Sequence, residues 1–312
     1  MVNGVAFIKG INFATFARRG VLGSQEAHAS RERMLKELAP DFVILTPAAM
    51  QQTAHSTQID FAGPHTSGDE ELIETIRFFH QRGVRVALKP TVNCLDGTWR
   101  AYISFIEPDV PSEPKWHEWF ASYTAFQLHF ARIAQQESCC MFIPGCEMVM
   151  ADHRDAEWRK LIADIRGVFS GLIAYNCDKY QEDHVTWWDC VDVIASSGYY
   201  PTGDWDRQLD RIEKVVEKYQ KPFFFSELGC MAVKGAAQLP NDWSLTGEPD
   251  VDEQTCWYQD MFQTALKRPW VGGFAFWDWA GIPYTPDREG HTYDLRGTKA
   301  AQLVHQVYTS HP

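Results

Sequence analysis

Two glutamates stand directly behind runs of mostly apolar residues, an unusual place for a carboxylate. Glu147 follows such a run in MFIPGCEMVM, and Glu227 follows three phenylalanines and a serine in FFFSELGCMA. Two carboxyl groups that face each other can hydrolyse a glycosidic bond: one, its pKa raised by apolar surroundings, protonates the leaving oxygen, while the other stays ionised and attacks the anomeric carbon. A carboxyl separation of about 5 Å gives retention of configuration and a larger gap gives inversion. This chemistry requires a fold that brings the two side chains together.

The elements that must position these glutamates alternate along the chain. Short runs rich in β-branched and aromatic residues predict strands at residues 5–12, 41–46, 84–92, 140–147, 171–176, 191–200, 222–227 and 271–279. Segments with helical periodicity lie between and after them, at residues 27–39, 69–82, 115–136, 155–169, 204–219, 252–267 and 296–308. Only the stretch DKYQEDHVTWWD, after the fifth expected strand, is too short for a full helix.

This alternation predicts a (β/α)8 TIM barrel that forms a single domain over residues 1–312. Continuous apolar strands suit a parallel sheet that is covered on both faces, and helical crossovers connect parallel neighbours. A doubly wound open sheet is the alternative, but no glycine-rich phosphate loop follows the first strand. Active sites of TIM barrels lie at the carboxyl ends of the strands, so Glu147 and Glu227, ending the fourth and seventh strands, are expected to face each other. Each alone could instead be a structural ion-pair partner, to Lys89 or an arginine.

Aromatic residues at strand ends predict a lining suited to a sugar. Tyr199 and Tyr200 follow the sixth expected strand, and Trp277 and Trp279 lie in the eighth. A flat aromatic face packs against the apolar C–H face of a pyranose, and a phenol or indole N–H adds a hydrogen bond. We therefore expect these four residues to contact substrate or the catalytic groups.

Three polar residues at strand ends complete the predicted site. Lys89 and Asn93 end the third expected strand and are expected to bind sugar hydroxyls, while Asn12 ends the first. For Lys89 the alternative is a structural bridge to a carboxylate of the barrel.

The motifs at these strands resemble glycoside hydrolase family 113, whose members are (β/α)8 retaining β-mannanases of clan A. The resemblance extends over residues 5–280 and rests on LKPTV, IPGCEM, WRKLIADIRGVFSGLIAYN, WWDCVDVIASSGYYP, KPFFFSELG and GGFAFWDW in this order. It implies that Glu147 is the acid/base and Glu227 the nucleophile, and that Trp277 forms the floor of the −1 subsite. It also implies that a tyrosine, Tyr199 or Tyr200, orients the nucleophile.

One residue departs from the pattern of clan A. Much of that clan has an asparagine immediately before the acid/base glutamate, where it bonds the 2-hydroxyl of the sugar, and this chain has Cys146. A thiol is a weak donor and acceptor. The reaction type is therefore better defined by the sequence than the substrate.

Composition excludes several other classes. The formal net charge is −12, and no basic block is present that would follow a phosphate backbone or an anionic membrane. Eight cysteines without zinc-ribbon spacing, and an N-terminus without the features of a signal peptide, predict a cytoplasmic protein. The histidines show no HExxH or other ligand set, so neither metal nor cofactor is expected. The sequence does not indicate an oligomeric state.

The sequence thus predicts a retaining hydrolase that cleaves β-1,4-mannosidic linkages in short oligosaccharides by double displacement. Long connections at residues 93–116 and 231–250 are expected to wall the groove and so to decide between endo and exo action. Another clan A β-glycosidase, acting on glucosides or on mannosyl-N-acetylglucosamine, is the alternative enzyme. A non-catalytic carbohydrate-binding barrel is the alternative outside the enzymes.

Overall fold

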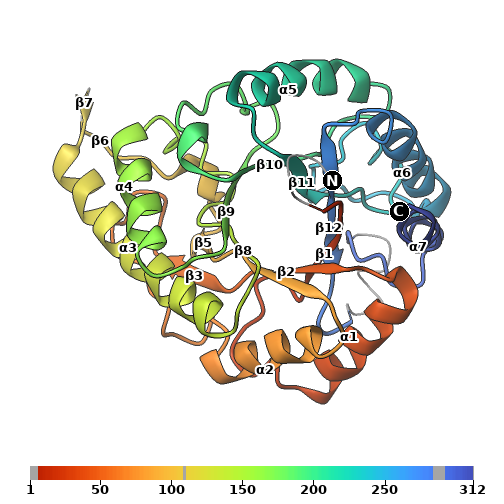
Figure 1. The fold of residues 1–312 in the computed structure, drawn as a ribbon, viewed down its shortest axis with the longest axis horizontal. Helices are drawn as coiled ribbons and strands as arrows, with labels where there is room; N and C mark the ends of the chain where they lie inside the picture. The colour runs from red at the N-terminus through yellow and green to blue at the C-terminus, as the bar shows by residue number, and fades with distance from the viewer. Residues whose placement is uncertain (1–5, 108–109, 284–291, 312) are drawn as a thin grey trace.

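The computed structural model describes residues 6–107, 110–283 and 292–311. Eight parallel strands close into a barrel in the order β1-β12-β11-β10-β9-β8-β4-β2, so the predicted fold class is confirmed (Figure 1). The strands are β1 Ile8–Phe13, β2 Phe42–Leu45, β4 Arg85–Leu88, β8 Met141–Phe142, β9 Leu172–Cys177, β10 Val193–Ser197, β11 Phe223–Leu228 and β12 Val271–Trp279. β1 pairs with both β12 and β2, which closes the ring.

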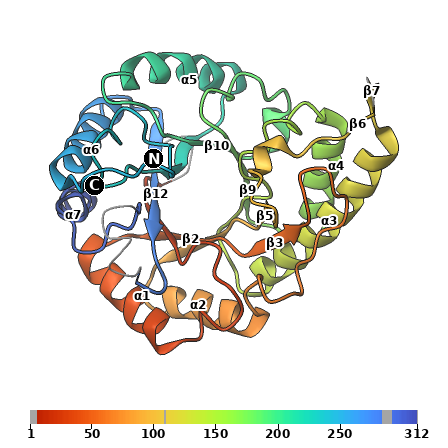
Figure 2. The same ribbon diagram turned by 180° about the vertical axis from the view of Figure 1, so that it is seen from behind.

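Helices surround this barrel, as Figures 1 and 2 show from its two ends. In the described parts of the chain they are α1 Gln25–Leu38, α2 Asp69–His80, α3 Glu113–Gln136, α4 Asp155–Arg166, α5 Trp205–Tyr219, α6 Val251–Ala265 and α7 Lys299–Ser310. The connection from β9 to β10 contains only the short 3-10 turn η2, Trp188–Cys190, as its length in the sequence predicts. None of the described helices is long and apolar enough to cross a lipid bilayer.

Two apolar clusters hold the barrel together. Side chains from all eight strands fill its interior, among them Ile44, Met141 and Phe224. A much larger cluster lies between the strands and the helices and includes many of the buried tryptophans. Alternate residues of each strand point to the two clusters, so a filled interior below the barrel mouth supports the residues at the strand ends.

The expected third strand, residues 84–92, is divided in two. β4 ends at Leu88, and after Pro90 the chain forms β5, Thr91–Cys94, which pairs with β3, Ala48–Gln51, outside the barrel. A proline has no N–H to donate to a sheet, which fits a break at this position. Lys89 consequently follows β4 directly, whereas Asn93 lies on the β3–β5 extension.

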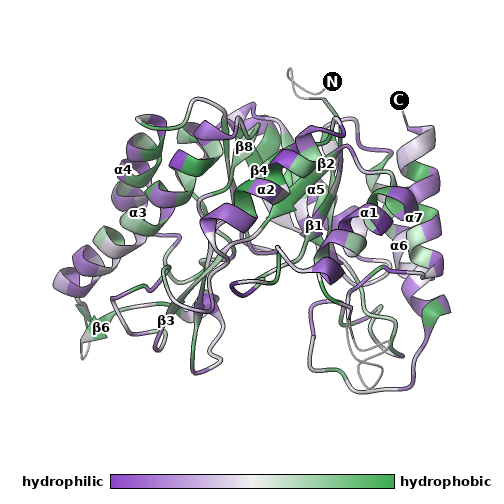
Figure 3. Cartoon of the chain, turned by 90° about the horizontal axis from the view of Figure 1, so that it is seen from below, coloured by the Kyte–Doolittle hydropathy of each residue, from purple (hydrophilic) through white to green (hydrophobic). Residues whose placement is uncertain are grey.

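The long connections gather at one end of the barrel, opposite the two chain termini (Figure 3). They include β3 and a short antiparallel pair, β6 Ile106–Glu107 with β7 Val110–Pro111. This is the end at which the strands finish and at which both glutamates were expected.

Candidate active site

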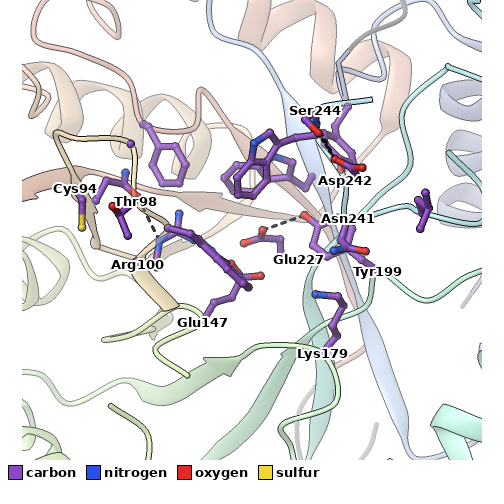
Figure 4. Close-up of a pocket in the computed structure, with 18 residues that line it drawn as sticks. Cys94, Thr98, Arg100, Glu147, Lys179, Tyr199, Glu227, Asn241, Asp242 and Ser244 are labelled. Atoms are coloured by element: carbon purple, nitrogen blue, oxygen red, sulfur yellow. Dashed lines mark hydrogen bonds and ion pairs between the residues drawn. The ribbon is translucent and has the colours of Figure 1, made fainter. Parts of the chain in front are cut away.

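A cavity of about 740 Å³ opens among these connections, a size typical of ligand pockets. Its lining combines six aromatic rings with carboxyl, amide and basic side chains (Figure 4). The aromatic residues are Phe16, Trp99, Tyr199, Trp243, Trp277 and Tyr293. Glu147 and Glu227 both line the cavity, so the fold brings the two predicted carboxylates into one site.

Glu227 lies within β11, where its carboxylate accepts from both sides. Tyr199 donates to Oε1 at 2.9 Å, and the Lys89 ammonium donates to Oε2 at 2.8 Å. The Cys146 thiol is 3.5 Å from the same Oε2. Burial raises the pKa of Glu227, but the positive charges of Lys89 and Arg100 outweigh burial, and its pKa lies below the usual range. Glu227 is thus held as a carboxylate.

Glu147 reaches the cavity by a different route. β8 ends at Phe142, and the chain returns to the sheet only through a bridge between Cys146 and Asn176. Glu147 has a φ of 54°, a left-handed conformation that is unfavourable by about 1 kcal/mol for a residue with a Cβ. Its own backbone N–H donates to the Asn176 carbonyl at 2.9 Å, which fixes this turn.

Three donors surround the Glu147 carboxyl group. Ser197 donates to Oε1 at 2.8 Å, whereas Arg100 at 2.9 Å and Trp99 at 3.3 Å donate to Oε2. Burial and the charge of Glu227 raise the pKa of Glu147, and Arg100 and Ser197 counteract only part of that rise. The pKa values of the two glutamates are therefore shifted in opposite directions.

Both glutamates are ion-paired, as the structural alternative predicted, yet both face the cavity. The Lys89–Glu227 and Arg100–Glu147 pairs are almost wholly buried. The two cations come from different kinds of structure. Lys89 directly follows the barrel strand β4, whereas Arg100 begins the short 3-10 turn η1, Arg100–Tyr102, in the long connection after β5. Lys89 contacts the carboxylate itself, which leaves fewer of its donors for a sugar hydroxyl.

The two adjacent tyrosines have separate partners. Tyr199 bonds Glu227, while Tyr200 points away from the cavity and donates to Glu182 at 2.7 Å. Glu182 also accepts from Ser196 and pairs with Arg211, outside the residues that line the cavity. The structure thus places Tyr199, and not Tyr200, beside the glutamates that line the cavity.

Of the other four predicted residues, two line the cavity and two do not. Trp277 and Asn93 line the cavity, and Asn93 accepts from Arg100 at 3.3 Å. Asn12 is buried and donates to three backbone carbonyls, including that of Ser226 at 3.0 Å. Trp279 is buried with its indole N–H bonded to Ser30. Asn12 and Trp279 are therefore in positions that support the barrel and do not line the cavity.

Several residues at the site were not singled out from the sequence. Asn176 ends the expected fifth strand and satisfies the same rule that identified the glutamates, a polar residue behind an apolar run. Arg100 and Trp243 belong to the two long connections that were expected to shape the groove, but nothing in those loops distinguishes them. Ser197 and Lys179 carry no sequence signal that marks them as functional.

A buried aspartate adds a further titratable group beside Glu147. Burial and the charge of Glu147 raise the pKa of Asp178 to about 7. The neighbouring Lys179, which lines the cavity, lies 3.4 Å from the Asp178 carboxylate and 5.7 Å from the centre of the Trp99 ring. Within the described ranges, no three histidine, cysteine or acidic side chains are grouped to hold a metal ion.

A barrel whose strand ends present one ionised and one protonatable carboxyl group to a cavity defines a class of protein, the glycoside hydrolases. The sequence profile of Glycoside Hydrolase Family 113 matches residues 11–296. The chain belongs to this family, and the resemblance noted in the sequence is confirmed.

Solved structures give the same assignment. A GH113 β-1,4-mannanase determined as a complex is 48% identical with a TM-score of 0.94, over 98% of this chain and 100% of that one. The GH113 β-mannanase AaManA from Alicyclobacillus acidocaldarius, in complex with ManMIm, is 36% identical with a TM-score of 0.92, over 99% of both chains. A β-D-glucuronidase from Dictyoglomus thermophilum, 16% identical with a TM-score of 0.67 over 51% of that chain, shares the fold alone. No curated protein sequence matches the chain.

Proposed function

We propose that this protein hydrolyses β-1,4-mannosidic linkages with retention of configuration, with Glu227 as nucleophile and Glu147 as acid/base. The observation that carries the proposal is the pair of unlike carboxyl groups at one cavity. Lys89 and Tyr199 hold Glu227 as a carboxylate, while burial raises the pKa of Glu147. The substrate is inferred from the β-mannanases that share 48% and 36% of its residues over nearly its full length.

In the first step a Glu227 oxygen attacks the anomeric carbon, and the bond from that carbon to the glycosidic oxygen breaks. Glu147 transfers its proton to the departing oxygen, so the leaving sugar is released as a neutral alcohol. Burial raises the pKa of Tyr199, which keeps its phenol protonated as a donor to Glu227.

In the second step the Glu147 carboxylate removes a proton from water, and the water oxygen attacks the anomeric carbon. The bond to Glu227 breaks, which returns that residue to its carboxylate form and releases a sugar of retained configuration. Arg100, Trp99 and Ser197 donate to Glu147 and stabilise the anion that performs this step.

The aromatic lining supplies surfaces for the sugar rings. Trp277 lies beside Phe16, with ring centroids 5.3 Å apart, and we assign it to the sugar at the cleavage point. Trp243 is 64% exposed and lies edge-to-face against Trp99, which suits a sugar farther along the groove. Asn93 is assigned to a sugar hydroxyl. Cys146 contacts Glu227 and Asn176, so another group must bind the 2-hydroxyl of the sugar.

We further propose that residues 1–312 form one catalytic domain that works in a reducing compartment, such as the cytoplasm, on short oligosaccharides. All eight cysteines are free thiols, and seven of them are buried or half-buried. Free thiols persist where glutathione keeps them reduced, and short oligosaccharides are the β-mannosides that can be imported there.

The first experiment follows cleavage of β-1,4-mannobiose to mannohexaose, and of mannosyl-β-1,4-N-acetylglucosamine, by proton NMR. Wild-type enzyme and Glu227→Ala are compared. The proposal predicts that only wild type releases products and that these appear first as β-anomers. The distribution of products separates endo from exo action.

Two other outcomes would contradict parts of the proposal. Initial release of α-anomers would exclude retention and the assignment of Glu227 as nucleophile. Turnover of gluco- or galacto-configured β-glycosides, with all mannosides left intact, would replace the substrate but leave the mechanism standing.

A further inference from the structure

A continuous chain of buried hydrogen bonds joins the two catalytic glutamates beneath the cavity. Lys89 donates to Glu227 Oε2 at 2.8 Å and to Asn176 Oδ1 at 3.1 Å. Asn176 Nδ2 donates to Ser197 Oγ at 3.0 Å, and Ser197 donates to Glu147 Oε1 at 2.8 Å. The chain thus runs from one catalytic carboxyl group to the other through three side chains.

The three connecting residues come from one side of the barrel, where β8 separates β4 from the adjacent pair β9 and β10, and they are inaccessible to solvent. Lys89 follows β4, Asn176 lies in β9 and Ser197 ends β10, and the exposed fraction of each is 0%. Asn176 itself bonds neither catalytic side chain. Buried polar networks that are fully satisfied fix a unique arrangement of their members, because every unmade bond is unfavourable in a low dielectric.

Lys89 sets the donor-to-acceptor direction of these hydrogen bonds. An ammonium group can only donate, so the Asn176 amide must present its oxygen to Lys89 and its NH2 group to Ser197. The second amide hydrogen goes to the Cys177 carbonyl at 3.0 Å, which fixes the amide further. Ser197 Oγ therefore accepts from Asn176, and its single proton is left for Glu147.

We propose that Lys89, Asn176 and Ser197 form a positioning relay that couples the two catalytic glutamates, with Asn176 as the residue that sets the direction of the Ser197 hydroxyl. This inference rests on the proposed function, because it assigns the relay to the orientation of the same two carboxyl groups. The relay ends on an ammonium group at Glu227 and on a neutral hydroxyl at Glu147. With Oε1 of Glu147 bonded to Ser197 and Oε2 bonded to Arg100 and Trp99, the rotation of the Glu147 carboxyl group is fixed.

Cys146, which stands where much of clan A has asparagine, lies against the relay. The thiol lies 3.7 Å from Asn176 Oδ1 and 3.5 Å from Glu227 Oε2. Burial raises the pKa of Cys146 well above its ordinary value, so it remains a neutral thiol next to the relay. The strong donors to Glu227 are then Lys89 and Tyr199. The side-chain amide at this place belongs to Asn176 on β9, and its oxygen accepts from Lys89.

The deciding variant is Asn176→Ala, which cuts the relay in the middle and leaves every direct contact of both carboxyl groups in place. We expect kcat to fall about five- to tenfold, the equivalent of one lost hydrogen bond, with KM unchanged. We also expect the pKa of Glu147 to rise, because the Ser197 hydroxyl is no longer directed at it. A merely structural role would lower the melting temperature and leave kcat and this pKa as they are.

A carboxyl ¹³C NMR titration of the glutamates in wild type and Asn176→Ala measures that pKa without any substrate. Ser196→Ala is the matched control, because Ser196 is the buried neighbour of Ser197 on β10 but bonds Glu182. The control is expected to leave the titration of Glu147 unchanged. A titration of Glu147 that is identical in Asn176→Ala and wild type would overturn the relay.

A double-mutant cycle tests the coupling directly. If the relay operates, Lys89→Met combined with Ser197→Ala lowers kcat by less than the product of the two single losses. This shortfall should vanish when the cycle is repeated in the Asn176→Ala background. Losses that multiply in both backgrounds would overturn the coupling. If Lys89→Met does not fold, the NMR titration decides alone.

Failure of the relay and failure of the proposed function give different results. A wild-type enzyme that cleaves β-mannosides, with Asn176→Ala equal to it in kcat and in titration, contradicts the relay only. A wild-type enzyme inactive on every β-mannoside contradicts the proposed substrate, while the titration still measures whether Asn176 controls Glu147.

Discussion

The ends of β8 and β11 carry the same residue type in opposite settings. Glu227 lies inside a regular strand, and its strongest partner is the ammonium of Lys89. Glu147 lies five residues beyond a strand of two residues, on left-handed backbone, among a hydroxyl, an indole and a guanidinium. The two settings shift the pKa values in opposite directions: two cations outweigh burial at Glu227, whereas burial and the charge of Glu227 outweigh Arg100 at Glu147. This difference supports the roles proposed for the two residues.

A third buried glutamate, Glu182, shows that burial and strong donors are not sufficient to place a carboxylate at the cavity. Glu182 is 0% exposed and accepts from Ser196, Tyr200 and Arg211, a donor set as rich as those of the catalytic pair. It does not line the cavity. Burial and a cation are therefore common to all three glutamates, and access to a substrate-sized cavity is what distinguishes Glu147 and Glu227 from Glu182.

The largest contrast is expected from Glu227→Ala. Without a nucleophile we expect turnover to fall by about 10⁵-fold. Added azide should restore a slow reaction on activated aryl β-glycosides and give a glycosyl azide of inverted configuration, because the anion enters from the side of the missing carboxylate. NMR of the azide product checks this. An azide product of retained configuration would contradict the assignment.

Glu147→Ala should separate the two steps. We expect a loss of about 10²- to 10⁴-fold on natural linkages, the usual contribution of general acid–base catalysis. Aryl glycosides with good leaving groups need no acid, so their first step should be spared while the second is slow. A pre-steady-state burst of phenol with a slow steady rate is the expected signature. Equal losses on natural and activated substrates would exclude the role of Glu147 as acid.

Arg100→Met should alter the pH dependence by removing the cation next to Glu147. Arg100 lowers the pKa of Glu147 and of Glu227, so both pKa values should rise in the variant. In a profile of kcat/KM, the acidic limb reports the ionisation of Glu227 and the alkaline limb the loss of the Glu147 proton. Both limbs should therefore move to higher pH, and the free energy of unfolding should fall by about 3–5 kcal/mol, since breaking a buried ion pair leaves an uncompensated buried charge. A profile whose limbs both stay in place would contradict the assignment.

Tyr199→Phe should give the smallest of these effects. It removes one hydrogen bond to the Glu227 carboxylate, for which we expect kcat to fall about tenfold. Tyr200→Phe is the matched control, since that phenol bonds Glu182 and does not touch the catalytic pair. Steady-state kinetics of both variants measures the difference. Equal losses in the two would show that neither tyrosine acts through Glu227.

Much of the fold and half of the predicted lining could be read from the sequence. Alternating apolar and amphipathic segments predicted the strand order of a barrel, and polar residues behind apolar runs predicted Glu147 and Glu227. The same rule pointed to Asn12, and the search for aromatic residues at strand ends pointed to Trp279, but neither side chain lines the cavity. It could not choose between Tyr199 and Tyr200, because both lie beyond Ser197, the last residue of β10, where strand alternation no longer fixes the direction of a side chain.

The sequence by itself determined the barrel and the presence of two carboxyl groups at its mouth, because hydrophobic periodicity and strand ends are local properties. The tertiary structure decided what each carboxyl group does, because the deciding contacts are long-range. Lys89 meets Glu227 from 138 positions away, and Ser197 meets Glu147 from 50. Such contacts depend on strand register and on the direction of hydrogen bonds in the buried barrel, and these exist only once the sheet has closed.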